Sequence, residues 1–104
     1  MKHIKEFKKL VEKGQYYDAH EVLEEIWFPI RKRKNDCALV LKGFINSAVS
    51  LELYKRGKVE QSKKVYKNYI KYVTTNRIIK TDNYIAFIEL KKDIDRYFSQ
   101  LDIK

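Results

Sequence analysis

The sequence predicts an all-α fold, a compact bundle of about five helices built from two antiparallel helix hairpins around a central apolar helix. Three observations support this prediction. Three glycines and one proline in 104 residues leave little material for the many turns of a β architecture. Apolar residues recur every three or four positions, and period-two alternation is missing. The hydrophobic share of 44% is enough for one core, so residues 1–104 are expected to form a single helical domain.

The first predicted hairpin joins a helix over residues 2–13 to a helix from Tyr16 to Phe28. Lysines separate the apolar residues of the first helix, which is therefore amphipathic. Gly14 is expected to end it as a left-handed cap, because glycine has no side chain to clash there. Pro29 lacks a backbone donor, so the second helix must end or kink at that point.

The central helix is expected over residues 36–56, after the basic connector RKRKND. Asn35 or Asp36 can cap its first turn, and Gly57 closes it. A helix that is apolar on most sides is a buried one. The apolar residues that point in nearly every direction around this helix are Leu39, Val40, Leu41, Phe44, Ile45, Ala48, Val49, Leu51 and Leu53.

Two further helices complete the predicted bundle. The segment TTNRIIKT is expected to be the break between them, and Thr81 or Asp82 is expected to cap the last one. The apolar face of the fourth helix consists of Val59, Ser62, Tyr66, Tyr69, Ile70 and Val73. The apolar face of the last helix consists of Phe87, Leu90, Ile94, Tyr97, Phe98 and Leu101.

A weak internal repeat supports the pairing of helices into hairpins. The segments GQYYDA, at 14–19, and GKVEQS, at 57–62, each place a glycine between two helices and a small residue five positions later. These small residues, Ala19 and Ser62, allow the second helix of each pair to approach the first closely. The chain is therefore expected to contain two similar antiparallel hairpins.

Charge and cysteine content bear on partners and compartment. The chain has 23 Lys and Arg against 14 Asp and Glu, a net charge of +9, which attracts nucleic acid or anionic lipid. Lysines far outnumber arginines, so a lysine-rich solvated surface explains the charge better, and nucleic-acid binding is expected to be weak and non-specific.

The lone Cys37 cannot form an internal disulfide, which fits the cytoplasm. The apolar run at residues 37–51 contains Lys42 and Asn46 and is judged too short for a membrane span.

The segment HEVLE contains the candidate site. On a helical wheel, His20 and Glu24 stand together at the border of the apolar arc beside Trp27, so both are expected to be half-buried. Glu21 lies one step further out, and Glu25 faces solvent. Buried polar groups need hydrogen-bond partners, so the role of the pair depends on what it contacts.

Two chemical roles for this segment remain open. A histidine and a carboxylate four positions apart can share a metal ion, but a catalytic zinc needs three protein ligands. The only other histidine is His3, near the N-terminus, so no bound metal and no cofactor are expected. Glu21 and Glu24 are candidates for acid–base work if a cleft exists.

The favoured role is structural. Lys42, Asn46 and Ser50 form one polar stripe on an otherwise apolar helix, and polar groups on a buried helix should meet polar groups. A seam that joins the His20–Glu24 pair to this stripe satisfies both sides. Where the seam opens to solvent, it is the expected small-ligand pocket. The predicted pocket or signature residues are Tyr17, His20, Glu21, Glu24, Trp27, Lys42 and Asn46.

The run G-x-Y-Y-x-A-H-E-x-x-E-x-x-W, Gly14 to Trp27, is followed by K-G-F-I-N-S-A and then by Y-K-R-G. Together these motifs resemble a small prokaryotic all-helical family catalogued as domain of unknown function 309, over roughly residues 5–75. The resemblance implies a compact helical bundle, no established activity, and signature positions within HEVLE and at the tryptophan. Lys42 stands where the family pattern commonly has glutamine, and Leu53 where it often has histidine.

These observations predict a binding or interaction module rather than an enzyme, with an unknown small ligand or a protein as partner and no membrane. The alternative is a small metal-dependent or acid–base enzyme that uses His20, Glu21 and Glu24. A weaker alternative is non-specific nucleic-acid binding through the basic surface. Eight tyrosines and five phenylalanines exceed what five short helices need internally, which slightly favours a homodimer.

Overall fold

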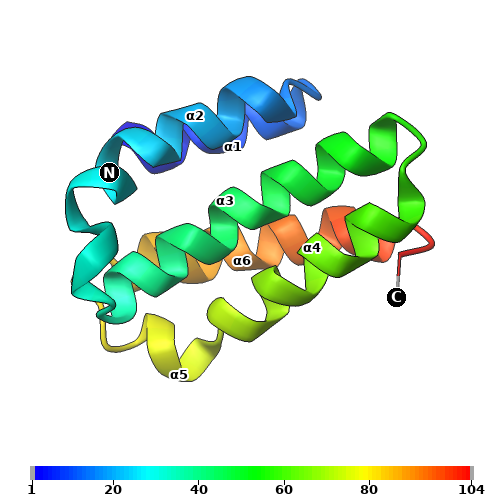
Figure 1. Cartoon of the computed structure of the whole chain (residues 1–104). Helices are drawn as coiled ribbons and strands as arrows, with labels where there is room; N and C mark the ends of the chain where they lie inside the picture. Colours follow the sequence, from blue (N-terminus) through cyan, green and yellow to red (C-terminus); the bar gives the residue numbers. More distant parts are fainter. Residues whose placement is uncertain (1, 104) are drawn as a thin grey trace.

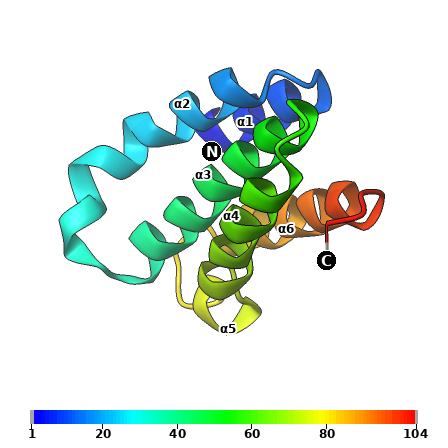
Figure 2. The same cartoon turned by 45° about the vertical axis from the view of Figure 1, so that its right-hand side comes forward.

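The computed structural model describes residues 2–103, and this range contains six α-helices, one 3₁₀ helix and no strand. Figure 1 shows α1 lying along α2 and α3 lying along α4, and Figure 2 shows the same pairs after a rotation. The all-α prediction is confirmed. The predicted five helices correspond to α1, α2, α3, α4 and α6. The elements are α1 (Lys2–Glu12), α2 (Tyr16–Trp27), η1 (Phe28–Arg33), α3 (Asp36–Lys55), α4 (Val59–Tyr72), α5 (Thr75–Ile78) and α6 (Tyr84–Ser99).

The two hairpins turn in the same way. Gly14 and Gly57 have φ angles of +75° and +80°, in the left-handed region that favours glycine. In each turn the glycine amide donates to the carbonyl three residues back, and the next amide donates to the carbonyl five residues back. This is the Schellman arrangement that closes a helix. Ala19 and Ser62 are fully buried, as the internal repeat predicts.

Phe44 of α3 marks the centre of the core. Its buried ring meets rings from three other helices, with centroid distances of 6.4 Å to Phe7 of α1, 6.0 Å to Tyr69 of α4 and 5.9 Å to Phe87 of α6. Edge-on and offset aromatic pairs of this kind contribute to stability beyond the area they bury. The helices therefore share one core, with α3 at its centre.

Small residues on α3 allow α4 to pack very closely. A Cβ atom at Gly43 would overlap Val73 Cγ2 and lie 3.0 Å from Tyr72 Cβ. Further along, Ser50 Oγ donates to the Ser62 carbonyl at 2.8 Å, and Ser62 Oγ donates to the Ser50 carbonyl at 2.7 Å. Each of the two buried hydroxyls thus finds its hydrogen-bond acceptor on the other helix, and no charged group is needed. This face fixes the rotation of α3 in the bundle.

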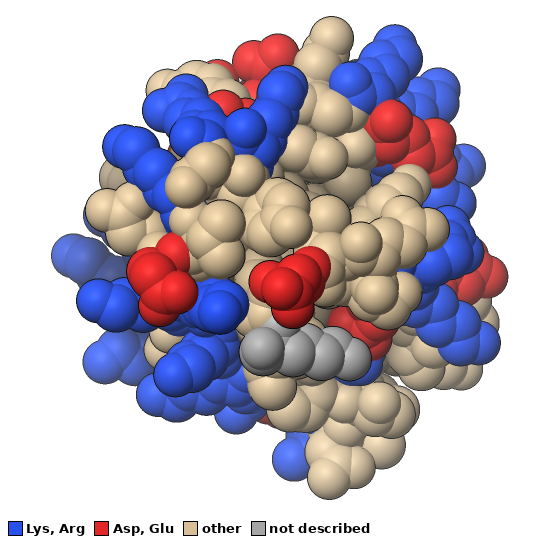
Figure 3. Space-filling model, turned by 90° about the vertical axis from the view of Figure 1, so that its right-hand side faces the viewer, with Lys and Arg blue, Asp and Glu red and all other residues tan. Residues whose placement is uncertain are grey.

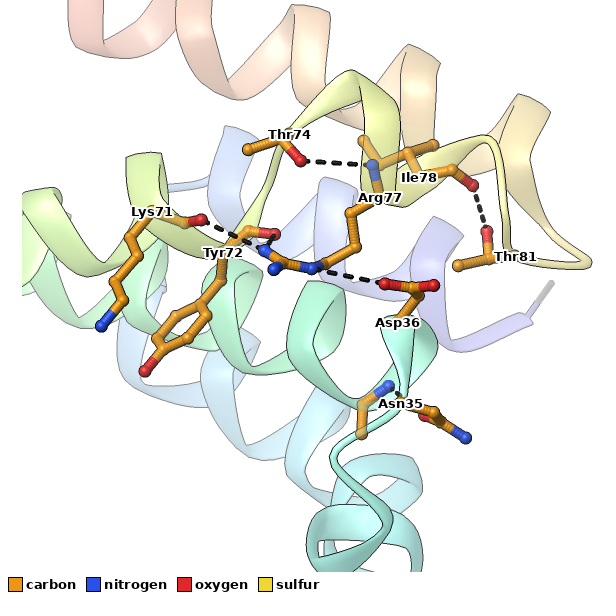
Figure 4. Close-up of polar contacts among 9 residues, drawn as sticks. Asn35, Asp36, Lys71, Tyr72, Thr74, Arg77, Ile78 and Thr81 are labelled. Atoms are coloured by element: carbon orange, nitrogen blue, oxygen red, sulfur yellow. Dashed lines mark hydrogen bonds and ion pairs between the residues drawn. The ribbon is translucent and has the colours of Figure 1, made fainter.

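Arg77 joins three elements at one corner of the bundle (Figure 4). Its Nη1 donates to the carbonyls of Lys71 and Tyr72 at 3.1 Å and 2.9 Å, which satisfies the end of α4. Its Nε lies 3.5 Å from Asp36 Oδ1 in the first turn of α3. Thr74 accepts from the Arg77 amide and begins α5, a short helix inside the predicted break TTNRIIKT.

The predicted caps are right for one helix and wrong for another. Asn35 Oδ1 accepts from the amide three residues on at 2.9 Å and begins α3, as predicted. The prediction that Thr81 or Asp82 caps the last helix is wrong, because the N-cap of α6 is Asn83. The Thr81 hydroxyl instead donates to the Ile78 carbonyl at 2.7 Å, at the end of α5. The Thr81 hydroxyl therefore belongs to the end of α5 and does not cap α6.

The connector after α2 is helical rather than flexible. Pro29 occupies the start of η1, where a missing backbone donor costs nothing, and the 3₁₀ helix ends at Lys34 with φ +52°. Arg31 lies 3.6 Å from the centroid of the Phe28 ring and donates to the Phe28 carbonyl at 2.6 Å. Most of the basic connector is therefore part of a 3₁₀ helix.

By length and composition, α3 is one helix among residues 2–103 that could cross a membrane. The prediction that this apolar run is too short to span a membrane is therefore wrong, because the helix that contains the run is long enough. The apolar window of α3 is 56% buried inside the bundle, and the core helix of a globular protein meets the same criterion. Its packing against α2, α4 and the aromatic core identifies it as the core helix of a globular helical domain.

Candidate functional site

Both ring nitrogens of His20 face oxygen atoms of α2. Nδ1 lies 2.6 Å from the Tyr17 carbonyl oxygen, and Nε2 lies 3.0 Å from Glu24 Oε1. A carbonyl oxygen only accepts, so Nδ1 must carry a proton and donate it. Nε2 faces the Glu24 carboxylate at ion-pair distance. The pair is a preformed hydrogen-bonded unit on the surface of α2.

The other predicted residues of α2 have separate surroundings. Glu21 is exposed, and the partly buried Trp27 packs against the core. The Glu24 side chain is 43% exposed, so solvent screens its pair with histidine. Glu25 is exposed as predicted, and its carboxylate lies 3.3 Å from His3 Nε2 of α1. Glu24 and Glu25 therefore pair with different histidines, and the predicted residues of α2 do not converge on one point.

The predicted seam between α2 and α3 is wrong. Asn46 Nδ2 donates to the Lys42 carbonyl of its own helix at 2.7 Å. Lys42 Nζ lies 5.1 Å from the centroid of the Tyr72 ring on α4, and Ser50 bonds to Ser62 on α4. Within residues 2–103, no hydrogen bond or ion pair links the stripe to the His–Glu pair of α2. Lys42 and Ser50 thus face α4, on the side where Gly43 lets that helix approach closely.

A groove of about 290 Å³ lies between the first half of α2 and the last turns of α3. Its volume is at the lower end of the range for small-ligand sites, about 300–1,000 Å³. A larger hollow over α1 is formed by the outer face of that single helix, so it is open surface and not a cleft between elements. The groove residues are Tyr16, Tyr17 and His20 of α2 with Val49, Glu52 and Leu53 of α3 and its C-cap Arg56.

Val49 and Leu53 give the groove an apolar floor, and both are partly exposed. The ring of Tyr17 is on the α2 side; this residue is 59% exposed and lies edge-on to His20 at 5.0 Å between centroids. Leu53 stands where the family resemblance leads one to expect a histidine. In this chain the groove therefore has an aliphatic side chain, and not a second imidazole, beside His20.

Charged groups lie along the α3 side of the groove. Arg56 Nε lies 2.7 Å from Glu52 Oε2, and the two side chains are 58% and 20% exposed. Lys55 Nζ donates to the Gly14 carbonyl at 3.1 Å and lies 5.8 Å from the Tyr16 ring centroid, so it ties the two hairpin ends together. Burial raises the pKa of Tyr16, which therefore stays neutral at physiological pH.

The groove opens near the end of the molecule that carries both glycine turns. Figure 3 views this end and shows a mostly uncharged central surface interrupted by acidic side chains, with lysines and arginines around much of its edge. The whole chain carries a net charge of +9, which favours the approach of anions. Two acidic side chains close to the groove, Glu52 and Glu24, are each paired with a basic group.

Metal and nucleophile chemistry find little support in this geometry. In the described range 2–103, no three or more His, Cys, Asp or Glu side chains come together as a metal site. His20 and Glu24 supply two ligand atoms, one fewer than a catalytic zinc needs from protein. Burial raises the pKa of the Cys37 thiol, which disfavours the reactive thiolate.

Of the predicted pocket residues, the groove includes only Tyr17 and His20, and all of its α3 residues were missed. A signal for them was present. Val49, Glu52, Leu53 and Arg56 are spaced three, four and seven positions from the first, which places them on one helical face. Both glycine turns lie at the same end of the bundle (Figure 1), so the start of α2 must lie beside the end of α3.

The predicted seam placed His20 opposite Lys42 and Asn46 of α3, and η1 explains why this register of α2 against α3 is wrong. This 3₁₀ helix adds six residues between α2 and α3, and Figure 2 shows the chain continuing beyond the end of α2 before it returns. At about 2.0 Å per residue, the addition is up to about 12 Å. That length equals about eight residues of α-helix. His20 therefore lies opposite the Val49–Arg56 region and not opposite Lys42.

Comparison with known proteins gives a family but no characterised relative. Neither the curated proteins nor the solved structures include a significant match to this chain. A family model matches residues 4–65, which is more than half of the chain and contains most of α1, all of α2, η1 and α3, and every residue of the groove. The chain therefore belongs to the family described as Domain of unknown function (DUF309), as its tyrosine, histidine and tryptophan motif predicts.

Proposed function

We propose that this protein is a helical binding module whose groove between α2 and α3 holds a small organic ligand. The observation that carries the proposal is the groove itself. It has an apolar floor of Val49 and Leu53, aromatic rings from Tyr16 and Tyr17, and charged groups at its edge. An apolar cleft with a few convergent polar groups is the usual form of a small-ligand site.

Binding is a better interpretation than catalysis because the polar groups of the groove are engaged with one another. His20 donates to a backbone carbonyl and pairs with Glu24. Glu52 pairs with Arg56. A general base must reach its substrate with a free lone pair, and here both ring nitrogens of His20 and one oxygen of each carboxylate are already engaged. The same pairs orient the groove residues, which favours recognition of a ligand.

Saturation-transfer NMR with a panel of small aliphatic and aromatic molecules bearing anionic, neutral or cationic head groups tests this function. Tyr17→Ala removes an exposed ring of the groove, and Leu53→Ser removes part of its floor. Ile70→Ser is the control, because Ile70 is an apolar residue of α4 that is 48% exposed and is not a groove residue. Circular dichroism establishes that each variant is folded.

We expect at least one class of molecule to bind the wild type and Ile70→Ser, and to bind both groove variants several-fold more weakly. A panel that gives no saturation transfer with the wild type contradicts the proposal. Binding that survives both groove substitutions also contradicts it, because the ligand would then lie elsewhere.

A further inference from the structure

The geometry points to a small organic carboxylate, with an aliphatic or aromatic body, as the class of ligand that the groove binds. This inference rests on the proposed function and adds the chemistry of the ligand. It combines the apolar floor of Val49 and Leu53 with the guanidinium of Arg56 at the edge. The body of the ligand would contact the floor, and its carboxylate would contact the guanidinium.

The pair with Glu52 holds Arg56 in place and leaves other donors of its guanidinium free. Only its Nε is paired with Glu52, at 2.7 Å, and the side chain is 58% exposed. The terminal amino groups of the guanidinium thus keep hydrogen atoms for a further acceptor. A planar guanidinium binds a carboxylate through two parallel hydrogen bonds. The pair with Glu52 orients this group before the ligand arrives, so less side-chain freedom is lost on binding.

The neighbouring charges favour an anionic ligand over a cationic one. In the Arg56–Glu52 pair the arginine side chain is 58% exposed and the glutamate 20%, so a ligand from solvent reaches the guanidinium more readily than the carboxylate. Lys55 Nζ makes one hydrogen bond, to the Gly14 carbonyl, and has further donors at the same end of the molecule. The whole chain is positive by 9 charges, which raises the local concentration of anions.

A singly charged carboxylate fits better than a phosphate group. The Glu52 carboxylate lines the groove and is 20% exposed, so an additional dianion beside it would be repelled more strongly than a monoanion. The floor of Val49 and Leu53 also gains from an apolar body, which inorganic phosphate does not have. The volume of about 290 Å³ limits that body to a small one.

Three probes with one branched aliphatic skeleton test the head group: 4-methylpentanoate, 4-methylpentanamide and 4-methylpentylammonium. Each is titrated into ¹⁵N-labelled protein, and the shifts of the groove amides give the dissociation constant. The variants are Arg56→Gln, which removes the charge, and Arg56→Lys, which keeps the charge but loses the planar fork. Arg33→Gln is the matched control, since Arg33 is an exposed arginine of η1, beyond the opposite end of α3.

We expect 4-methylpentanoate to bind the wild type and Arg33→Gln about fivefold or more tightly than the other two probes. Arg56→Gln should abolish this preference and leave the three probes equal, and Arg56→Lys should retain part of it. Equal binding of the amide, or tighter binding of the ammonium probe, overturns the carboxylate inference and leaves the binding function standing. If no probe shifts the groove amides of the wild type, the carboxylate inference fails. Failure of the broader panel as well would remove the proposed function.

Discussion

Replacement of Gly43 by alanine tests the close contact between α3 and α4 that sets the rotation of the central helix. At an exposed helical position, glycine to alanine stabilises by about 0.8–1 kcal/mol. Here the new Cβ would overlap Val73 Cγ2 and lie 3.0 Å from Tyr72 Cβ and 3.3 Å from the Val73 nitrogen. Val73 is stiff at χ1 and only 2% exposed, so it has little room to move.

Overpacking of this kind costs about 1–3 kcal/mol. After the gain in helix propensity is subtracted, we expect Gly43→Ala to lower the free energy of unfolding by up to about 2 kcal/mol. For a chain of this size, each 1 kcal/mol lowers the melting temperature by about 4 °C. Urea and thermal unfolding, followed by circular dichroism, measure both quantities.

A double-mutant cycle with Val73→Ala distinguishes this clash from a general loss of stability. Val73→Ala alone removes buried methyl groups and should cost about 1.5–3 kcal/mol. In the Gly43→Ala background, Val73→Ala also makes space for the new Cβ. The stability lost by the double variant should therefore be about 1 kcal/mol less than the sum of the two single losses. The packing argument is refuted if Gly43→Ala stabilises the protein by about 1 kcal/mol, as at an exposed site, or if the two costs are additive.

Two further predictions concern single side chains. His20→Ala should lower the free energy of unfolding, measured in urea, by about 1–2 kcal/mol, because it removes a donor to a backbone carbonyl and the partner of Glu24. Glu25→Ala should lower it by less than about 0.5 kcal/mol, because the pair that Glu25 forms is exposed. Equal losses for the two variants would contradict this account. Burial, then the hydrogen bond to Asp95, raises the pKa of Tyr69 above its ordinary 10.0. Above pH 10 the unfolded chain loses this proton first, so stability that is complete below pH 10 falls as the pH rises further. Tyr69→Phe should reduce this fall by up to about 1.4 kcal/mol per pH unit, and an unchanged fall in alkaline unfolding would refute the assignment.

The sequence was sufficient to predict the helices whose ends carry specific residues. Gly14 and Gly57 tolerate the left-handed conformation that ends a helix, and the Asn35 side chain accepts a first-turn amide, so each ends or begins a helix as predicted. The short helix α5 was missed because four residues are too few for a periodic pattern. Its start could have been recognised from Thr74, whose hydroxyl accepts the Arg77 amide.

The candidate site was harder to predict because the central helix is apolar on almost every side. Such a helix has no amphipathic pattern from which to infer its rotation. The rotation follows instead from Gly43 and Ser50, whose small side chains let α4 approach. The register of α2 against α3 depends on the length of η1, and Pro29 was interpreted as the end of helical structure. Both properties are set by tertiary contacts, which local patterns do not encode.

Intermolecular nuclear Overhauser effects between 4-methylpentanoate and the methyl groups of the protein test the central claim most directly, because they locate the ligand. We predict contacts from the branched end of the probe to the methyl groups of Val49 and Leu53. Contacts to Ile4 and Ala86 instead, in the smaller hollow between α1 and α6, would contradict the assignment of the α2–α3 groove as the binding site.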